Sequence, residues 1–318
     1  MALALVTGGA GFIGSHLVEG LLARGHTVRV LDNFATGHRE NLAGVAGRIE
    51  LVEDDVRDLD AARRAAQDVD VVFHLAALPS VARSVQNPLE SSQVNLTGTL
   101  HVLLAARDAR VKRVVYAASS SAYGNQPTLP QVEAMAPGPL SPYAISKLAG
   151  EMYVRAFAQL YRLSTLSLRY FNVFGPRQDP ATQYAGVIAK FTTCALEGRP
   201  YPVNGNGGQS RDFTYVENVV RANLLAAEVG IAEGQTVNIA YGQRTTVNQI
   251  AAMLNGLTGQ DLPTRHRPDP VGDVRHSHAD ITLARTLLGY EPKVDVREGL
   301  KRTLEWHQGQ RTQKPDCR

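Results

Sequence analysis

The sequence is poor in cysteine, with only Cys194 and Cys317 among its 318 residues. The two lie far apart in unrelated contexts, and no CxxC spacing occurs. This pattern disfavours both a disulfide framework and a zinc site, so we expect no bound metal. Free thiols fit a reducing compartment, and a cytoplasmic location is the simplest expectation.

Long apolar runs and an excess of one charge are also lacking. No stretch approaches the roughly 18 apolar residues that a membrane-spanning helix needs. The 33 Lys and Arg residues nearly balance 30 Asp and Glu residues, for a formal net charge of +3. This balance gives no electrostatic footprint for nucleic acid. The first residues, MALALVTGGAG, lack the basic start of a signal peptide and instead predict a strand that leads into a glycine turn.

Short apolar runs are what the N-terminal half does contain, and they alternate with helical patterns. The runs are ALALVT, TVRVLD, IELVE, DVVFHLA and VKRVVYAAS, and segments such as FIGSHLVEGLLARG lie between them. Nearly continuous apolar strands separated by helices indicate a parallel sheet that is covered on both faces. The sequence therefore predicts a doubly wound α/β fold of the Rossmann type.

The pattern changes after Phe171, where long turn-rich pieces such as GRPYPVNGNGGQSRDF appear. Unstructured connections of this length in a compact domain usually carry function. We expect residues 1–170 to form a dinucleotide-binding domain. Residues 171–318 are expected to form mainly a smaller, mixed substrate-binding domain, with segments near 213–241 returning to the first domain.

A glycine turn, TGGAGFIG, places Gly8, Gly11 and Gly14 between the first strand and the first helix. Asp32 ends the next strand, 18 residues after Gly14. A tight structural turn would also explain the glycines alone. The order of strand, glycine turn, helix, strand and carboxylate is typical of dinucleotide binding, because the glycines let a pyrophosphate approach the helix N-terminus.

The carboxylate of Asp32 would accept hydrogen bonds from ribose hydroxyls and would repel a 2′-phosphate. This favours NAD over NADP. Asn33 follows it at the strand end, where a plain turn is also compatible. Asp55 and Val56, just past the third strand, either border the adenine or form another turn.

The segment SPYAISK begins a helix with Ser141 at the N-cap and Pro142 at the first helical position. Tyr143 and Lys147 are then one turn apart on one face of this helix. An amphipathic helix with a solvated lysine is the alternative interpretation. Ser119, however, ends the apolar strand before this helix, and the carboxyl ends of parallel strands share one ligand crevice. We therefore expect these three side chains to meet.

The residue types suit hydride chemistry on an alcohol. A tyrosine has a pKa of about 10, too high for a base at neutral pH, but the Lys147 ammonium and a positive nicotinamide ring would both favour its phenolate. Tyr143 could then take an alcohol proton while Ser119 orients the substrate oxygen and Lys147 bonds the nicotinamide ribose.

Further segments match the same pattern along nearly the whole chain: DDVRD, HLAA, VNLTGT, SSSAYG, LRYFNVFGPRQ, SRDFTYV and GDVRHSHAD. Together with TGGAGFIG and YAISK, they resemble the extended short-chain dehydrogenase/reductase family, in particular the UDP-sugar 4-epimerases. The resemblance implies an isomerase that holds NAD tightly, oxidises a UDP-hexose at C4 to a keto sugar, and returns the hydride to the other face.

The resemblance also implies site residues. The expected cofactor-binding residues are Gly8, Gly11, Phe12, Ile13, Gly14, Asp32, Asn33, Asp55, Val56, Ala76, Ala77, Tyr143, Lys147 and Tyr170. The expected substrate-binding residues are Ser120, Ser121, Arg83, Asn172, Val187, Tyr201, Val203, Arg211, Arg275 and Ser277. Among these, Asn172 and Arg211 are expected at the diphosphate, and Tyr201 and Val203 at the uracil. A structural ion pair with Asp212 is the alternative for Arg211.

The choice of sugar depends, by resemblance, on the residue beside the C2 substituent, which here is Ser277. A small side chain leaves room for an N-acetyl group, so we expect UDP-N-acetylglucosamine and also UDP-glucose as substrates. The family commonly has an Arg where this chain has Pro270, and Arg267 or Arg275 would have to replace it. Asp179, in the loop after Arg177, is some evidence against UDP-glucuronate.

Three alternatives remain. Ser120 and Ser121 stand where related sugar dehydratases have an acid, which disfavours dehydration. A net sugar-nucleotide oxidoreductase would share the site, and a noncatalytic NAD-binding protein would share the fold. The resemblance implies a homodimer through the segment 91–109 and the Tyr143 helix, although Val94, Leu103 and Leu104 could instead belong to the core.

Overall fold

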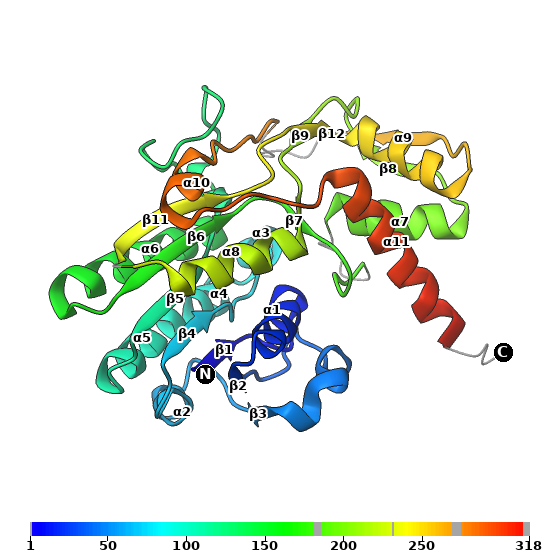
Figure 1. Ribbon diagram of the computed structural model, residues 1–318. Coiled ribbons are helices and arrows are strands. Elements are labelled where there is room, and N and C mark those ends of the chain that lie inside the picture. Colours follow the sequence, from blue (N-terminus) through cyan, green and yellow to red (C-terminus); the bar gives the residue numbers. More distant parts are fainter. Residues whose placement is uncertain (1, 181–185, 231, 269–274, 314–318) are drawn as a thin grey trace.

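A parallel sheet dominates the computed structural model, which describes residues 2–180, 186–230, 232–268 and 275–313 (Figure 1). Its seven strands lie in the order β11-β6-β5-β4-β1-β2-β3, and every neighbouring pair is parallel. The strands are β1 (Leu3–Thr7), β2 (Thr27–Leu31), β3 (Ile49–Val52), β4 (Val71–His74), β5 (Arg113–Ser119), β6 (Thr165–Tyr170) and β11 (Glu233–Ile239). The predicted Rossmann-type α/β fold is confirmed.

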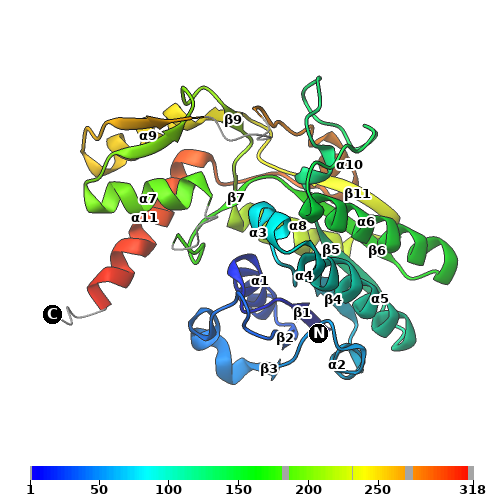
Figure 2. The same cartoon turned by 180° about the vertical axis from the view of Figure 1, so that it is seen from behind.

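Helices cover both faces of this sheet because successive strand residues point to opposite sides. In β1, Val6 packs with α1 (Phe12–Ala23) and α8 (Val216–Glu228), whereas Leu5 packs with α5 (Gly98–Asp108) and α6 (Pro142–Tyr161). Figure 2 shows α5 and α6 side by side on the second face. The short α2 (Leu59–Ala66) packs on α5, and η1 (Arg39–Arg48) precedes β3.

Helix α6 starts as its sequence predicts. The Ser141 hydroxyl accepts from the Ala144 backbone N–H at 3.1 Å, and Pro142 occupies the first turn, where its missing N–H costs nothing. The helix ends at Arg162, which adopts a left-handed conformation with φ 55°. This start fixes the direction of the face that carries Tyr143 and Lys147.

The segment 91–109 does not form one regular helix. It is divided into the end of α4 (Pro88–Ser92), a wider π-helical turn η2 (Gln93–Thr97) and α5. Buried Asn95 lies in this wider turn, and its carboxamide bonds the Leu78 backbone and the Ser146 hydroxyl. Leu103 is buried in the core, and Val94 and Leu104 pack against that core, so these three side chains are core residues.

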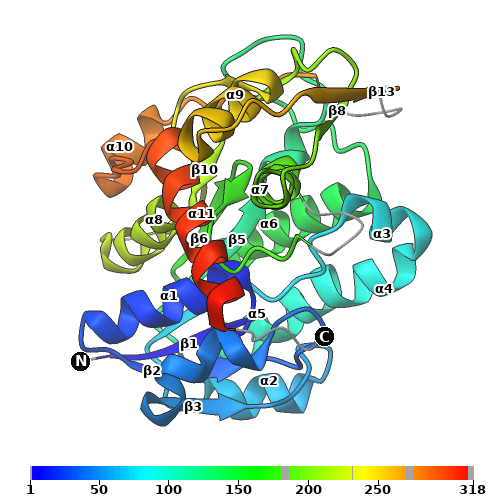
Figure 3. The same cartoon turned by 90° about the vertical axis from the view of Figure 1, so that its right-hand side faces the viewer.

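The C-terminal half builds a smaller region beside the carboxyl ends of the strands (Figure 1, Figure 3). Its core includes side chains of α7 (Val187–Glu197), α9 (Val247–Thr258), α11 (Val296–Gln313) and β8 (Tyr201–Asn204), and β8 pairs with β13 (Thr264–Arg267). The remaining elements are α3 (Val81–Gln86), η3 (Ser120–Tyr123), β7 (Val173–Phe174), β9 (Ser210–Arg211), β10 (Thr214–Tyr215), β12 (Thr245–Thr246) and α10 (Thr282–Leu288).

The chain crosses back between the two regions, since α8 packs on α1 and β11 adds to the sheet beside β6. Within the described ranges, no helix is both long and apolar enough to cross a membrane.

Candidate active site

A cavity of ≈ 1140 Å³ lies along the carboxyl ends of the sheet strands, between the two regions. Residues that end or follow five neighbouring strands line it: Gly8 after β1, Asn33 after β2, Ala76 after β4, Ser119 in β5 and Tyr170 in β6. In this strand order the winding direction changes between β1 and β4, where ligands bind in open α/β sheets. The cavity is therefore where the fold itself predicts a ligand.

The glycine turn makes a close-fitting cradle at one end of the cavity. A Cβ on Gly14 would lie 2.1 Å from the Gly8 carbonyl oxygen, and one on Gly8 would lie 2.7 Å from the Ala76 nitrogen. Gly8 also has φ +71°, which disfavours any side chain. Gly11, the N-cap of α1, has no side chain to cap the helix, and an uncapped helix N-terminus favours an anion.

Asp32 is held rigidly beside this turn. Its carboxylate accepts from the Ala10 and Phe34 backbone N–H groups, both at 2.8 Å, and the side chain is buried. Burial raises the pKa of Asp32, and the two N–H donors oppose that effect. The cradle and the fixed carboxylate fit the pyrophosphate and a ribose of a dinucleotide.

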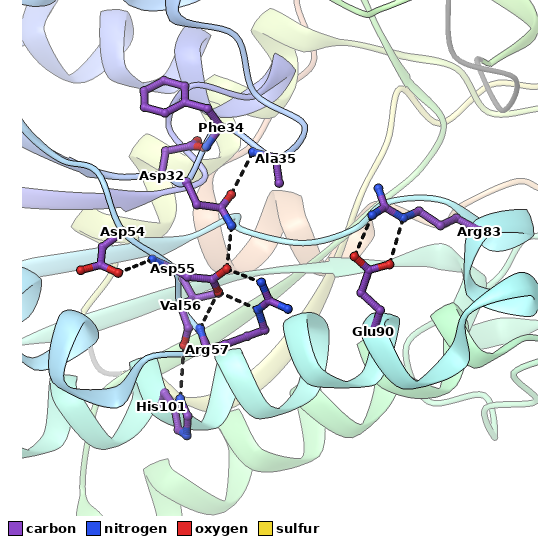
Figure 4. A network of polar contacts seen from close by, with 11 residues as sticks. Asp32, Phe34, Ala35, Asp54, Asp55, Val56, Arg57, Arg83, Glu90 and His101 are labelled. Carbon is purple, nitrogen blue, oxygen red and sulfur yellow. Dashed lines mark hydrogen bonds and ion pairs between the residues drawn. The ribbon is translucent and has the colours of Figure 1, made fainter.

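A polar network around Asp55 and Arg57 continues along the same rim (Figure 4). The Asn33 carboxamide donates to Asp55 at 2.7 Å, and Asp55 accepts two further side-chain bonds from Arg57. The Arg57 guanidinium holds the pKa of Asp55 below its usual range. Further along the cavity wall, Arg83 pairs with Glu90 at 2.8 Å. Arg83 therefore has a structural partner as well as a place on the cavity.

Ser119, Tyr143 and Lys147 line one cavity, as expected, and come from the end of β5 and one face of α6. The Ser119 hydroxyl is 2.9 Å from that of Ser121. The Tyr143 backbone N–H donates to Ser84 in α3 at 3.0 Å, which ties the start of α6 to the cavity wall. The strand and the helix thus bring together a hydroxyl, a phenol and an ammonium.

The electrostatics of Tyr143 differ from the expectation. Burial raises its pKa, and Ser119 is the group that opposes this effect, whereas a lowering by Lys147 was expected. Burial also lowers the pKa of Lys147 to about 7. Desolvation therefore disfavours the charged forms of both side chains.

Lys147 is flanked by the Tyr116 ring and by Glu151. Its Nζ lies 4.4 Å from the centroid of the Tyr116 ring, and Gly150 leaves room for that ring, since a Cβ there would be 2.3 Å from the Tyr116 oxygen. One turn further along α6, buried Glu151 opposes the lowering of the Lys147 pKa by burial and is itself paired with Arg169 at 2.7 Å. Sequence reasoning did not identify these supports.

The opposite wall carries Asn172, Arg211 and Ser277. The Asn172 carboxamide donates to the Ser277 hydroxyl at 3.2 Å and to the Asp212 backbone oxygen at 3.1 Å. Arg211 donates to the backbone oxygen of Arg275 at 3.0 Å. The Asp212 carboxylate instead accepts from the backbone N–H groups of Tyr241, Gly242 and Ala279.

Three of the expected substrate-binding residues, Tyr201, Val203 and Arg275, do not line the cavity, so their prediction as side-chain contacts is wrong. Tyr201 and Val203 are both fully buried in the core of the C-terminal region, where Tyr201 bonds Asn255. Strand side chains alternate, so the other face of β8 supplies the cavity residues, Pro202 and Asn204. The Arg275 side chain is exposed and does not line the cavity, because its segment contributes its backbone to β9. Pro270 lies outside the described residues.

The remaining expected residues all line the cavity: Gly8, Gly11, Phe12, Ile13, Gly14, Asp32, Asn33, Asp55, Val56, Ala76, Ala77, Tyr170, Arg83, Ser120, Ser121, Asn172, Val187, Arg211 and Ser277. Sequence reasoning missed Thr36, Gly37, Gln131, Gln178 and Gln209, which line it as well. Gly37 had a detectable signal, since it follows the Asp32 strand end in a small-residue loop. Gln131 lies in an irregular segment that gave none.

His74 ends β4 next to the cavity and is a buried core residue with both ring nitrogens hydrogen-bonded. Its ring bonds the hydroxyls of Thr7 at 2.7 Å and Thr99 at 2.9 Å. Burial lowers its pKa to about 3, so the ring is neutral. In the described part of the chain, no cluster of His, Cys, Asp and Glu side chains could hold a metal ion.

The glycine turn, the fixed carboxylate and the cavity at the strand ends are those of a dinucleotide-binding protein with a Rossmann-type fold. The model of the NAD dependent epimerase/dehydratase family matches residues 4–240, and the chain belongs to that family.

Relatives resemble the chain over almost its whole length. A UDP-glucose 4-epimerase of Mycolicibacterium smegmatis is 40% identical over 95% of this chain and 97% of its own. A UDP-glucose 4-epimerase structure from Thermotoga maritima with UDP-glucose has a TM-score of 0.92 and 42% identity, covering 97% of this chain and 99% of that one. A UDP-N-acetylglucosamine 4-epimerase structure from Methanobrevibacter ruminantium has a TM-score of 0.93 and 37% identity, with 97% and 99% covered.

Proposed function

We propose that this protein is an NAD-dependent UDP-sugar 4-epimerase. The observation that carries the proposal is the meeting of Ser119, Tyr143 and Lys147 with the glycine cradle and Arg211 on one cavity. A dinucleotide, a hexose and a diphosphate each find suitable groups there. The similarity to 4-epimerases over nearly the full length supports the same activity.

Different residues of the cavity would bind the dinucleotide and transfer the proton. Gly8, Gly11 and Asp32 would hold the dinucleotide, which when bound supplies the acceptor and then the donor of the C4 hydride. Tyr143 takes the C4 hydroxyl proton and later returns one to the keto oxygen of the sugar. Ser119 orients that oxygen and opposes the rise in the Tyr143 pKa, and Lys147 would bond the nicotinamide ribose.

The binding side of the cavity must hold a substrate whose reacting ring turns over during the reaction. Arg211 would provide a charge-assisted bond to the diphosphate, and Asn172 lies next to it. A firmly held diphosphate lets the sugar present either face of C4 without leaving the enzyme. Inversion, and not net oxidation, follows from this retention.

We propose UDP-N-acetylglucosamine and UDP-glucose as the substrates. Ser277 supports this choice, because its small side chain lines the cavity and adds little bulk there. Asp179 also lines the cavity and would repel the carboxylate of a uronic acid. The test is product analysis by NMR with UDP-glucose, UDP-N-acetylglucosamine and UDP-glucuronate.

The expected result is inversion of the first two sugars and little of the third. Ser277→Tyr should remove turnover of UDP-N-acetylglucosamine while leaving UDP-glucose within a fewfold range. Turnover of UDP-glucose alone by the wild-type enzyme would contradict the broad specificity. Stoichiometric growth of NADH absorbance with a UDP-sugar would instead identify a net oxidoreductase.

We also propose a cytoplasmic homodimer. Exposed apolar side chains lie along α6 at Ile145, Met152 and Leu160, with exposures of 56%, 59% and 74%. They follow a heptad-like spacing, and α3 and α4, which pack on α6, expose Val85 and Leu89. A second copy of the same face would cover both sets.

Light scattering tests the homodimer. The expected mass is twice that of the chain, and Leu160→Asp should lower it towards the monomer value. A wild-type monomer at micromolar concentration would contradict the proposal.

A further inference from the structure

Gln131 is a buried polar residue on the cavity wall with no assigned role. Its exposed fraction is 2%, it lines the cavity, and its carboxamide oxygen has no hydrogen-bond partner in the described part of the chain. Buried polar groups are nearly always paired, because leaving one unpaired costs free energy. The unpaired atom is the buried carboxamide oxygen of a residue that lines the cavity, so a ligand group is the partner to look for.

The backbone of Gln131 is fixed on several sides. Its N–H donates to the His278 carbonyl oxygen at 2.6 Å. Its own carbonyl oxygen accepts from the Asp280 backbone N–H at 2.9 Å and from the Asn238 carboxamide at 3.0 Å. Asn238 in turn accepts from the Tyr123 hydroxyl at 2.7 Å. A fixed backbone that carries an unpaired polar atom is the construction expected of a preorganised contact.

These same bonds place Gln131 at the sugar end of the cavity. The chain through Asn238 and Tyr123 leads to η3, which carries Ser120 and directly follows Ser119. On the other side, Gln131 forms a β-bridge with Ala279, two residues after Ser277. Gln131 is thus tied to both segments that border the sugar in the proposed function.

The chemistry of a carboxamide narrows the ligand group. It is uncharged, and it offers one acceptor and two donors. A hydroxyl or an acetamido group can pair with either end of it, whereas a carboxylate can use only the donors. The ligand group that fits is an uncharged, hydrogen-bonding substituent of the hexose.

We infer that Gln131 binds the sugar ring of the substrate directly, through a hydroxyl or an acetamido substituent, and so helps to select neutral hexoses. The inference rests on the proposed function for the identity of the ligand. Replacing Gln131 should therefore weaken binding of the substrate without lowering the Tm of the protein. Replacing an unpaired buried amide by an apolar side chain of similar size relieves the free protein of a desolvated group.

The experiment compares Gln131→Leu with Gln126→Leu, a matched substitution in the same connecting segment. The Gln126 carboxamide is satisfied by the backbone oxygens of Tyr123 and Ala136, both at 2.9 Å, and Gln126 does not line the cavity. Calorimetry then measures the Kd for UDP, UDP-glucose, UDP-N-acetylglucosamine and UDP-glucuronate, and thermal unfolding gives Tm.

For Gln131→Leu we expect affinity for UDP-glucose or UDP-N-acetylglucosamine to fall roughly tenfold, the size of one lost hydrogen bond. Affinity for UDP should stay within about twofold, and Tm should be unchanged or higher. Loss with both sugars indicates a shared hydroxyl, and loss with the N-acetyl sugar alone indicates the acetamido group. Gln126→Leu should lower Tm and leave all four Kd values unchanged.

Two results would overturn the inference. One is unchanged affinity of Gln131→Leu for both neutral UDP-sugars. The other is an equal loss of affinity for UDP, which would indicate a structural role. Because binding is measured apart from turnover, these results are separate from a failure of the wild-type protein to invert C4, which would refute the proposed function itself.

Discussion

The two walls of the cavity hold their side chains in different ways. The Rossmann wall carries Ser119, Tyr143 and Lys147, and the C-terminal wall carries Asn172, Arg211 and Ser277. On the first, a seven-residue strand and a 20-residue helix fix the side chains through their backbones. On the second, β9 and β10 have two residues each, and side-chain bonds to backbone take over the positioning.

Buried Asp212 shows how the C-terminal wall is organised. Its carboxylate gathers N–H groups from Tyr241, Gly242 and Ala279, while its backbone oxygen accepts from Asn172. One side chain thus connects three segments that are far apart in sequence. The difference suggests that the reaction centre is built on a rigid frame and that substrate recognition is built on irregular segments joined by polar contacts.

The largest effect should come from the Rossmann wall. Tyr143→Phe removes the proton acceptor, so turnover should fall by about 10³-fold, within the range of lost acid–base catalysis. Bound NAD should remain, because the glycine cradle is untouched. Steady-state kinetics and the absorbance of the released cofactor measure both quantities.

Tyr153→Phe on the same helix is the matched control, since that side chain is 39% exposed on the outer face. It should turn over like the wild type. A Tyr143→Phe enzyme with near-normal turnover would remove the reaction centre from this wall.

On the C-terminal wall, Arg211→Leu should act mainly on binding. Loss of a charge-assisted contact to the diphosphate should weaken UDP affinity roughly 10- to 100-fold, with kcat at saturation changed much less. Titration of UDP by calorimetry measures the loss. Arg265→Leu, at an exposed position of β13, should leave the affinity unchanged. An Arg211→Leu variant that binds UDP normally but fails in kcat would reverse the two roles.

Two buried groups should make the free energy of unfolding depend on pH in opposite directions, and the first is Asp212. Its pKa in the folded chain is raised by burial to about 7, against an ordinary value near 3.8. The stabilisation from its protonated form is complete below pH ~4 and is lost as the pH rises through 7. In the wild type this group should lower the free energy of unfolding by on the order of 2–3 kcal/mol between pH 4 and 7. Asp212→Asn should remove that decrease, which urea titration measures.

His74 is the second buried group, and its expected effect on the free energy of unfolding is smaller. Its folded pKa of about 3 lies below the ordinary 6.5, so its contribution to stability is complete above pH 6.5 and is lost as the pH falls towards 3. His74→Gln should flatten the decline between pH 6.5 and 4.5 by about 2 kcal/mol. An unchanged slope in this variant would show that the ring is protonated in the folded protein.

The same contrast decides how much the sequence could predict. In the N-terminal half, apolar strands, the glycine turn and the Ser141–Pro142 helix start are local patterns, and the doubly wound fold class could be predicted from them. Ser119, Tyr143 and Lys147 were found because a strand end and a helix period position them without help from distant residues.

The C-terminal wall could not be predicted in this way. The face that YPVN presents to the cavity depends on β13 and α7, so Tyr201 and Val203 were assigned to the wrong side. Gln131 is positioned by Asn238 and by the segment around Ala279, more than 100 residues away in sequence. Segments joined by such long-range polar contacts leave no periodic signal in the sequence.

The central claim is that C4 of the sugar loses and regains its own hydrogen within one enzyme-bound cycle. The most direct test is to incubate the wild-type enzyme, without added NAD, with UDP-glucose carrying deuterium at C4, and to follow the products by NMR. The account predicts UDP-galactose that keeps the deuterium at C4. No inversion, or UDP-galactose with hydrogen from solvent at C4, would contradict it.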